Sequence, residues 1–300
     1  MINFFDKLYY ILSNDNFILR CFRYLVRVSA NLYAKYMMTV NRKSHIVDND
    51  TVIVSLTSFP ARISDVWITI ATLLNQDYEN MKVVLWLSGE EFPSIENLPA
   101  KLLALQQKGL DIQIVPDNLK PHKKYFYAMR KYPNNTLITV DDDILYRSDL
   151  ISSLVKAHEK FSGCVICNRG VIISSSNYST WEKGVECNIP DTSLLPTGIA
   201  GVLYPRFCYD KSNIFDVNAI KETCLSGDDL WLSFMTRSVG TKVVLNKYKT
   251  GLITLLSSQK SALCVKNIGQ NRNDLQIANL DKWAKSRLGK SFYLKSLVSR

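Results

Sequence analysis

The chain has 300 residues, 47% of them hydrophobic and only 12 Gly and 9 Pro, which excludes a disordered protein and allows one large core or two smaller ones. Its 37 basic and 27 acidic residues give a formal charge of +10, which favours anionic partners. This charge gathers at the two ends of the chain and not among aromatic residues on one folded face, so we expect no nucleic acid partner.

Residues 1–45 are predicted to form a basic, amphipathic helical segment. They contain no cleavable signal sequence and no run of roughly 20 apolar residues, the length that a membrane-spanning helix requires. Arg20, Arg23, Arg27 and Lys35 fall on one narrow stripe of an otherwise apolar and aromatic helix. The pattern favours a helix lying in the headgroup region of an anionic membrane. The alternative is a helix packed on the body of the protein with its stripe in water.

From residue 51 onward, short β-branched runs alternate with helical patterns. Strands are predicted at 51–57, 81–87, 112–115 and 136–140, and helices at 65–76, 95–108 and 122–131. Such alternation is typical of an α/β protein with a doubly wound, mostly parallel, Rossmann-like sheet.

The fourth predicted strand ends at three adjacent acids, Asp141, Asp142 and Asp143, which lie between apolar runs. Like charges side by side repel, so either a bound cation or a solvated turn must make the cluster tolerable. Ligands of doubly wound sheets bind outside the carboxyl ends of the strands, where this cluster is expected. The sequence has neither a GxGxxG nor a GxxxxGKS/T loop, which disfavours dinucleotide dehydrogenases and P-loop enzymes.

The seven cysteines have no repeating spacing, and their odd number favours a reducing, cytoplasmic compartment. The one CxxC motif, Cys164 to Cys167, lies in an apolar run typical of a strand. Strand alternation would send the two thiols to opposite faces, so we expect core packing and not a redox pair.

Several stretches together resemble the bacterial family 2 glycosyltransferases. The strand at 52–57, the helix after it and the run LLNQDYENMKVVLWLS at 73–88 are similar to the opening of these enzymes. VDDD at 140–143 resembles their DXD motif, and SGDDLWL at 226–232 resembles their later acidic motif at a helix start. The resemblance implies a GT-A fold over residues 46–260, with residues 261–300 as a basic helical tail packed on it.

The resemblance also implies an activity. It is the transfer of one sugar from a nucleotide-diphosphate sugar, with a UDP-sugar as the expected donor, to a glycan or glycolipid acceptor. Such enzymes serve capsule, O-antigen or lipopolysaccharide assembly, which implies a peripheral position on the cytoplasmic face of the inner membrane. No QxxRW motif occurs, which argues against a processive synthase.

A divalent cation, Mn²⁺ or Mg²⁺, would neutralise the leaving diphosphate, and one or two carboxylates suffice to hold it. By resemblance, Asp143 would ligate the metal together with Asp141, and Asp141 would also hydrogen-bond the nucleoside. Asp142 would orient its neighbours. The alternative is an acidic turn without a ligand.

The acceptor hydroxyl must lose a proton to a base. Asp228 and Asp229 are the candidates, and the resemblance favours Asp229. One base and one displacement would invert the anomeric configuration. The alternative is ordinary helix stabilisation, with Ser226 as the N-cap and both acids in the first turn.

Further residues are expected at the donor and acceptor. Those expected to contact the donor are Thr57, Ser58 and Arg62 after the first strand, Glu90 after the second, and Lys123 and Lys124 at the third helix. The family often has an acid at the end of the second strand that contacts uracil. Here the strand is followed by Ser88 and Gly89 before Glu90, so Glu90 would substitute for that acid, and the nucleotide base stays open. A solvated basic turn is the alternative for the lysines. Tyr178 and Trp181 stand in a long polar stretch, where Trp181 either stacks on an acceptor sugar or anchors the loop in the core.

Two other functions remain open. A sugar nucleotidyltransferase also places acids on an α/β sheet, but it needs a glycine-rich loop near the first strand, and SLTSFPARI has no glycine. A non-catalytic, membrane-bound scaffold that keeps the fold predicts that the loss of Asp143 or Asp229 leaves function intact.

Overall fold

The computed structural model describes residues 1–12, 16–42, 47–258 and 272–293. The boundaries expected after residues 45 and 260 lie outside the described residues.

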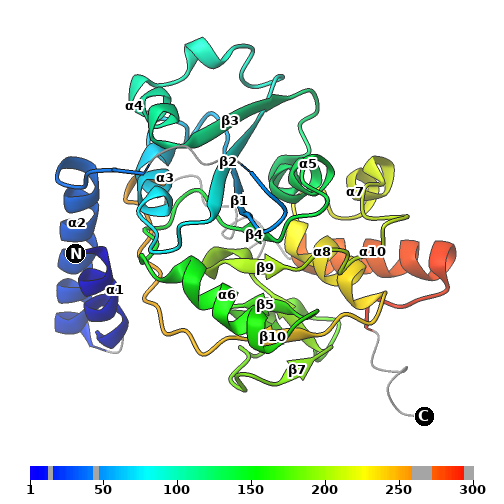
Figure 1. Ribbon diagram of the computed structural model, residues 1–300. Coiled ribbons are helices and arrows are strands. Elements are labelled where there is room, and N and C mark those ends of the chain that lie inside the picture. Colours follow the sequence, from blue (N-terminus) through cyan, green and yellow to red (C-terminus); the bar gives the residue numbers. More distant parts are fainter. Residues whose placement is uncertain (13–15, 43–46, 259–271, 294–300) are drawn as a thin grey trace.

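The core is an eight-stranded sheet in the order β3-β2-β1-β4-β9-β5-β10-β7 (Figure 1). Its first half consists of parallel strands, namely β1 (Val52–Thr57), β2 (Met81–Ser88), β3 (Leu110–Val115) and β4 (Leu137–Thr139). Its second half is mixed and contains β9 (Val202–Tyr204), β5 (Val165–Cys167), β10 (Val243–Leu245) and β7 (Pro190–Asp191). A separate pair is formed by β6 (Gly170–Ile172) and β8 (Leu194–Pro196). The predicted α/β sheet is confirmed, and the four predicted strands lie within two residues of their expected bounds.

Helices cover both faces of the sheet, because strand β1 carries apolar side chains on both sides. Ile53 belongs to one apolar cluster and Val54 to the other. The Val54 cluster includes residues of α3 (Val66–Leu74), α4 (Ala100–Ala104) and α6 (Leu150–Lys160). The Ile53 cluster includes residues of α5 (Lys123–Lys131), α7 (Val217–Thr223), α8 (Asp228–Arg237) and α10 (Arg272–Leu288).

The single helix predicted over 95–108 is wrong. The chain forms a 3-10 turn at Ile95–Asn97, then α4, then a second 3-10 turn at Gln106–Lys108. Pro99 is the reason for the first break, because it lacks the N–H that a helix interior needs and therefore stands at the N-cap of α4.

The two cysteines of the CxxC motif have free thiols and pack in different apolar clusters, Cys167 with Ile53 and Cys164 with Val54, so the predicted core packing on opposite faces is confirmed. Cys167 is buried in β5, and burial raises the pKa of its thiol well above the ordinary value. Cys164 precedes the strand and is half-buried.

The N-terminal segment folds as a hairpin of α1 (Ile2–Ile11) and α2 (Phe17–Tyr36), and α2 lies against α3 (Figure 1). The four basic residues of the predicted stripe do not share one environment. Arg20 and Lys35 are exposed, whereas Arg27 is buried and donates to two carbonyls of the body, Thr254 O at 3.0 Å and Leu255 O at 2.8 Å, so the alternative of a stripe left in water is wrong at Arg27. Arg23 turns back onto α1, where its guanidinium lies 3.8 Å from the Tyr9 ring. Among the described residues, no helix has the length and apolarity that crossing a bilayer requires.

Candidate active site

The three acids follow β4 at the carboxyl edge of the parallel strands, as predicted. The backbone N–H of Asp141 donates to the Tyr146 hydroxyl at 2.9 Å, and that hydroxyl donates to the carbonyl of Ile199 at 3.2 Å. Tyr146, which the sequence did not single out, therefore joins the acid turn to the segment before β9. Within this turn, Asp142 is buried, whereas Asp141 keeps a third of its side chain exposed.

Lys124 is the central cation of the site. Its Nζ lies 3.0 Å from Asp141 Oδ1 and 2.9 Å from Asp228 Oδ2, so it joins the acid turn to the start of α8. The Ser55 hydroxyl donates to the Lys124 carbonyl and so fixes the start of α5 against β1. Burial alone would lower the pKa of Lys124, but the surrounding acids outweigh it and hold that pKa well above its ordinary value. Lys124 is therefore a permanent positive charge in this cluster.

Asp229 is the second acid of α8 and remains partly exposed. Its Oδ2 accepts a hydrogen bond from the Gly198 N–H at 3.0 Å. Desolvation, and after it the charge of Asp228, raise the pKa of Asp229 to about 7, although Lys124 opposes the rise. An accessible carboxylate with a pKa near neutrality is suited to accept a proton.

Gly198 stands where the two acidic motifs meet. A Cβ at this position would lie 3.1 Å from Lys124 Nζ, 3.2 Å from Asp229 Oδ1 and 3.3 Å from Asp141 Oδ1. Asp141 and Asp229 are 88 positions apart in the sequence, and the fold brings both carboxylates to this one point. By resemblance, Gly198 and Gly201 before the LYP run at 203–205 belong to an acceptor-side segment, but the closeness of Gly198 to both acids is purely tertiary and has no local signal.

Of the helix-stabilising alternative, the two acids do lie in the first turn of α8, but Ser226 as its N-cap is wrong. Gly227 occupies the N-cap of α8, and no side chain caps that helix end. The Ser226 hydroxyl donates instead to Gln276 of α10 at 3.0 Å.

Arg62 is the second cation of the site. It bonds Asp142 through Nη1 and lies 3.1 Å from Asp143 Oδ2 through Nη2. The Ser58 hydroxyl donates to the other oxygen of Asp142 at 2.6 Å. Ser58 and Arg62 thus hold Asp142, which faces protein and supports the turn. Burial raises the pKa of Asp143 to about 6, against the opposing effect of Arg62.

The two adjacent lysines have different surroundings. Lys123 is buried, and its one described side-chain hydrogen bond goes to the neutral Asn118 Oδ1 at 3.0 Å. Burial lowers the pKa of Lys123 to about 8. The Asn118 N–H donates in turn to Glu90 Oε1 at 3.2 Å, so Glu90 and Lys123 both contact Asn118 beyond the ends of β2 and β3.

The Thr57 hydroxyl is less available for a donor contact, because it donates to the Trp86 carbonyl at 2.7 Å.

Two aromatic candidates have structural roles. Trp181 is buried, donates through Nε1 to the Ser175 carbonyl at 2.9 Å and stacks on Phe292. It anchors its loop in the core, which was one of the two interpretations of the sequence. Tyr178 packs against Trp181 with ring centroids 4.9 Å apart.

Within the described ranges, no three His, Cys, Asp or Glu side chains form a ready-made metal site. The cluster nevertheless offers two partly exposed carboxylates, with 33% of the Asp141 side chain and 14% of the Asp143 side chain accessible. Mg²⁺ and Mn²⁺ sites of phosphate-transferring proteins use one or two carboxylates plus phosphate oxygens. The residues therefore fit a metal that arrives with a diphosphate, and they fit a lone metal poorly.

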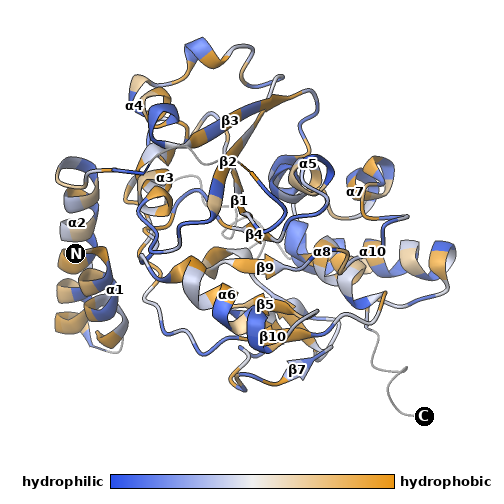
Figure 2. Cartoon of the chain, in the orientation of Figure 1, coloured by the Kyte–Doolittle hydropathy of each residue, from blue (hydrophilic) through white to orange (hydrophobic). Residues whose placement is uncertain are grey.

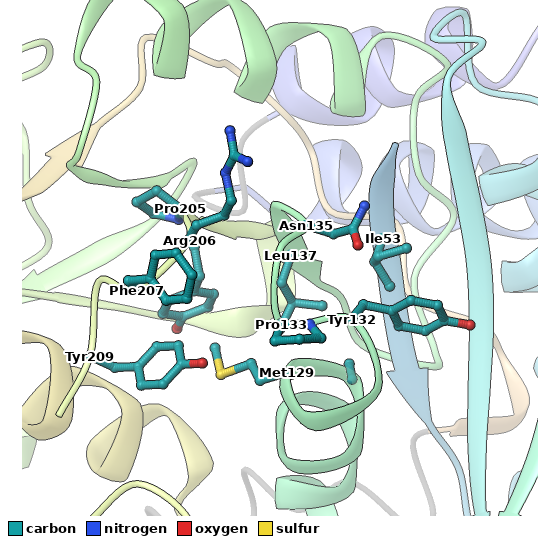
Figure 3. A pocket seen from close by; sticks show the side chains of 12 residues that line it. Ile53, Met129, Tyr132, Pro133, Asn135, Leu137, Pro205, Arg206, Phe207 and Tyr209 are labelled. Atoms are coloured by element: carbon teal, nitrogen blue, oxygen red, sulfur yellow. The ribbon is translucent and has the colours of Figure 1, made fainter. Parts of the chain in front are cut away.

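A small cavity lies away from this cluster, between α5, the start of β4 and the end of β9 (Figure 3). Met129, Tyr132, Leu137 and Phe207 are among its lining residues, and its volume is about 10 Å³. That is the space of one water molecule, so the cavity is no substrate site.

No family model matches the chain, and no curated protein matches it. Among solved structures, residues 1–349 of S. aureus TarS are 12% identical with a TM-score of 0.46, over 83% of this chain and 75% of that one. The mannosyltransferase PcManGT from Pyrobaculum calidifontis, in complex with GDP-Man and Mn²⁺, is 14% identical with a TM-score of 0.46, over 89% and 72%. At such low values these similarities decide nothing about activity, so the functional argument rests on this chain's own side chains.

Proposed function

We propose that the chain is a metal-dependent, non-processive glycosyltransferase of the GT-A type that uses a nucleoside-diphosphate sugar. The observation that carries this proposal is the meeting of Asp141 and Asp229 around Gly198. A transferase needs a diphosphate-binding acid turn and a proton acceptor within one sugar's reach of each other. The strand-end turn supplies the first, and the start of α8 supplies the second.

The donor half of the site is built by the acid turn and the lysine at the start of α5. Asp143 and Asp141 are the carboxylates that would hold Mn²⁺ or Mg²⁺, and the bound ion would supply positive charge to the leaving diphosphate. Lys123 is a buried cation whose side-chain hydrogen bond goes to a neutral oxygen and whose acidic neighbours, first among them Glu91, do not offset its burial, so a diphosphate oxygen would add a direct charge partner. Glu90, joined to Lys123 through Asn118, is placed to contact the nucleoside.

The acceptor half is built by Asp229. With a pKa of about 7, this carboxylate is substantially ionised at neutral pH and can take the proton of an attacking hydroxyl. Proton removal and a single displacement would leave the product with inverted anomeric configuration. We further propose a UDP-sugar as the donor and a lipid-linked glycan as the acceptor. Both follow from the family resemblance of VDDD and SGDDLWL, and they place the protein in surface polysaccharide assembly on the cytoplasmic face of the inner membrane.

The rate of transfer should depend on pH in a bell-shaped manner. Asp229 acts as a base only when ionised, so kcat/KM should rise as the pH increases through about 7. Lys123 carries its charge only below about pH 8, so donor affinity should fall at higher pH. A pH series of kcat and KM separates the two limbs, and a rate that is flat between pH 6 and 9 would contradict both assignments.

Replacing Lys123 with methionine should weaken binding of the nucleoside diphosphate by at least about tenfold without loss of stability. One charge-assisted contact to phosphate is worth about 1.5–3 kcal/mol. The folded protein loses no ion pair in the variant, because the lysine's described side-chain bond goes to an amide oxygen. Titration calorimetry measures the affinity, and the melting temperature checks the fold. Unchanged affinity in a folded variant would remove Lys123 from the donor site.

The proposed function itself is tested by a thermal-shift screen of UDP-, GDP-, ADP- and dTDP-sugars, each with Mn²⁺ and with EDTA. A ligand that binds only the native state stabilises it by about 2.7 kcal/mol at a hundred times its Kd. We expect one nucleotide to raise the melting temperature in the presence of Mn²⁺ only. If no nucleotide gives a shift under either condition, the proposal fails.

A further inference from the structure

Helix α2 packs on the protein through small and polar residues, with Ala30 and Ala34 buried beside two polar side chains. Its buried side carries Arg27 and Asn31, and both bond the backbone of residues 254–256. A surface helix of a globular protein normally buries its apolar stripe and leaves the polar residues in water. This helix buries small and polar residues and leaves its large apolar side chains exposed, so these have no partner in the described structure.

The exposed side of α2 carries an apolar stripe that is interrupted at Ser29. Ile18, Phe22, Leu25, Leu32 and Tyr36 recur at intervals of three, four or seven residues and are each at least half exposed. Of the eighteen large hydrophobic side chains exposed in the described residues, twelve belong to residues 1–37. Figure 2 shows the hairpin at one side of the molecule, with orange residues along both helices. Apolar surface concentrated in this way marks an interaction site.

The charges around this stripe have one sign. The exposed charged residues in the described part of α1 and α2 are Lys7, Arg20 and Lys35, all basic. Asp6 is buried and accepts hydrogen bonds from Thr250 and Gly251 of the body. A second copy of the same face would bring like charges together, whereas an anionic bilayer complements both the apolar stripe and its basic edge.

We propose that the α1–α2 hairpin docks the protein on an anionic lipid bilayer. Ile18, Phe22, Leu25 and Leu32 of the stripe lie among the acyl chains, Tyr36 lies at headgroup depth, and Lys7 and Lys35 contact the anionic headgroups. Arg27 and Asn31 hold the hairpin to the body. This inference stands on the surface of the hairpin alone and does not depend on the proposed transfer reaction.

The test is co-sedimentation of the full chain with vesicles of phosphatidylcholine and about 30 mol% phosphatidylglycerol, without nucleotide. The variant Phe22→Gln/Leu25→Gln/Leu32→Gln should lower the partition coefficient by at least about tenfold, because binding scales with buried apolar area. Lys7→Gln/Lys35→Gln should weaken binding mainly at low salt. Leu275→Gln, which removes an equally exposed leucine from α10, is the matched control and should bind like the wild type.

Three results would overturn the proposal. The first is wild-type protein that stays in the supernatant at low salt, and the second is a triple variant that binds the vesicles as well as wild type. The third is a wild-type protein that is dimeric while the triple variant is monomeric, which would identify the stripe as a contact between two copies. All substituted side chains are exposed, and circular dichroism confirms that the variants keep their helices. Because no nucleotide is present, failure here leaves the donor-site screen unaffected.

Discussion

Replacing Asp229 with asparagine should reduce the rate of sugar transfer by about 10²–10⁴-fold, the contribution typical of a positioned base. The amide keeps an oxygen that can accept the Gly198 N–H, so the fold and the donor site should survive. A donor-binding titration and a melting curve on the same preparation verify this. The loss should appear in kcat, because Asp229 is not among the donor-binding residues.

Asp228→Asn is the matched variant. Asp228 faces Lys124, and its negative charge is one of the causes that raise the pKa of Asp229. The asparagine variant should therefore retain a base and shift the acid limb of the pH profile below 7. If Asp228→Asn abolished transfer and Asp229→Asn retained it, Asp228 would be the base and Asp229 would not. Transfer that survives both substitutions would favour the non-catalytic scaffold.

Replacing Lys124 with methionine should lower the free energy of unfolding by about 3–5 kcal/mol, the cost of removing one partner of a buried ion pair. The variant leaves the Asp228 carboxylate buried without its cation and leaves Asp141 unpaired. The deficit should shrink as the pH falls toward about 7, because Lys124 lowers the pKa of Asp229 and the carboxyl therefore protonates at a higher pH in the variant than in wild type. Urea unfolding at several pH values measures both effects.

Lys123→Met is the control for this experiment, since the two lysines are neighbours on one helix and differ in their partners. A buried lysine whose pKa is lowered to about 8 is destabilising in its charged form, so methionine at 123 should leave stability unchanged or raise it. Equal losses of stability in the two variants would contradict the assignment of Lys124 as the cation that holds the acid turn to α8.

The strands and the place of the acid turn could be predicted because both follow from local pattern. Alternating apolar runs define β1 to β4, and a run of acids after β4 must lie at the carboxyl edge of the sheet. The break at Pro99 was also a local signal, but the apolar periodicity on both sides of it outweighed that signal in the prediction of one helix.

The division of work within the site could not be predicted. Lys123 and Lys124 differ by about 100° around α5, and only the packing of that helix shows which one faces the acids. The resemblance marks Gly198 only as part of an acceptor-side segment. That a Cβ there would lie within 3.3 Å of three charged groups from other segments follows from tertiary packing alone. The helix periodicity of α2 correctly separates its basic and apolar sides, but it does not say which side faces the body. The side that faces the body is set by Arg27, which donates hydrogen bonds to two carbonyls more than 220 positions away in the sequence.

The central claim is that the acid turn binds a diphosphate through a divalent cation, and calorimetric titration of wild type and Asp143→Asn with the nucleoside diphosphate from the screen tests it. Asp111→Asn is the control, because it breaks a 3.0 Å ion pair with Lys82 at the far ends of the strands. We expect Mn²⁺ to raise the affinity of both wild type and Asp111→Asn for the nucleoside diphosphate. With Mn²⁺ present, Asp143→Asn should bind the nucleoside diphosphate at least about tenfold more weakly than wild type. Equal affinity of wild type and Asp143→Asn in the presence of Mn²⁺, or binding that ignores the metal, would contradict the claim.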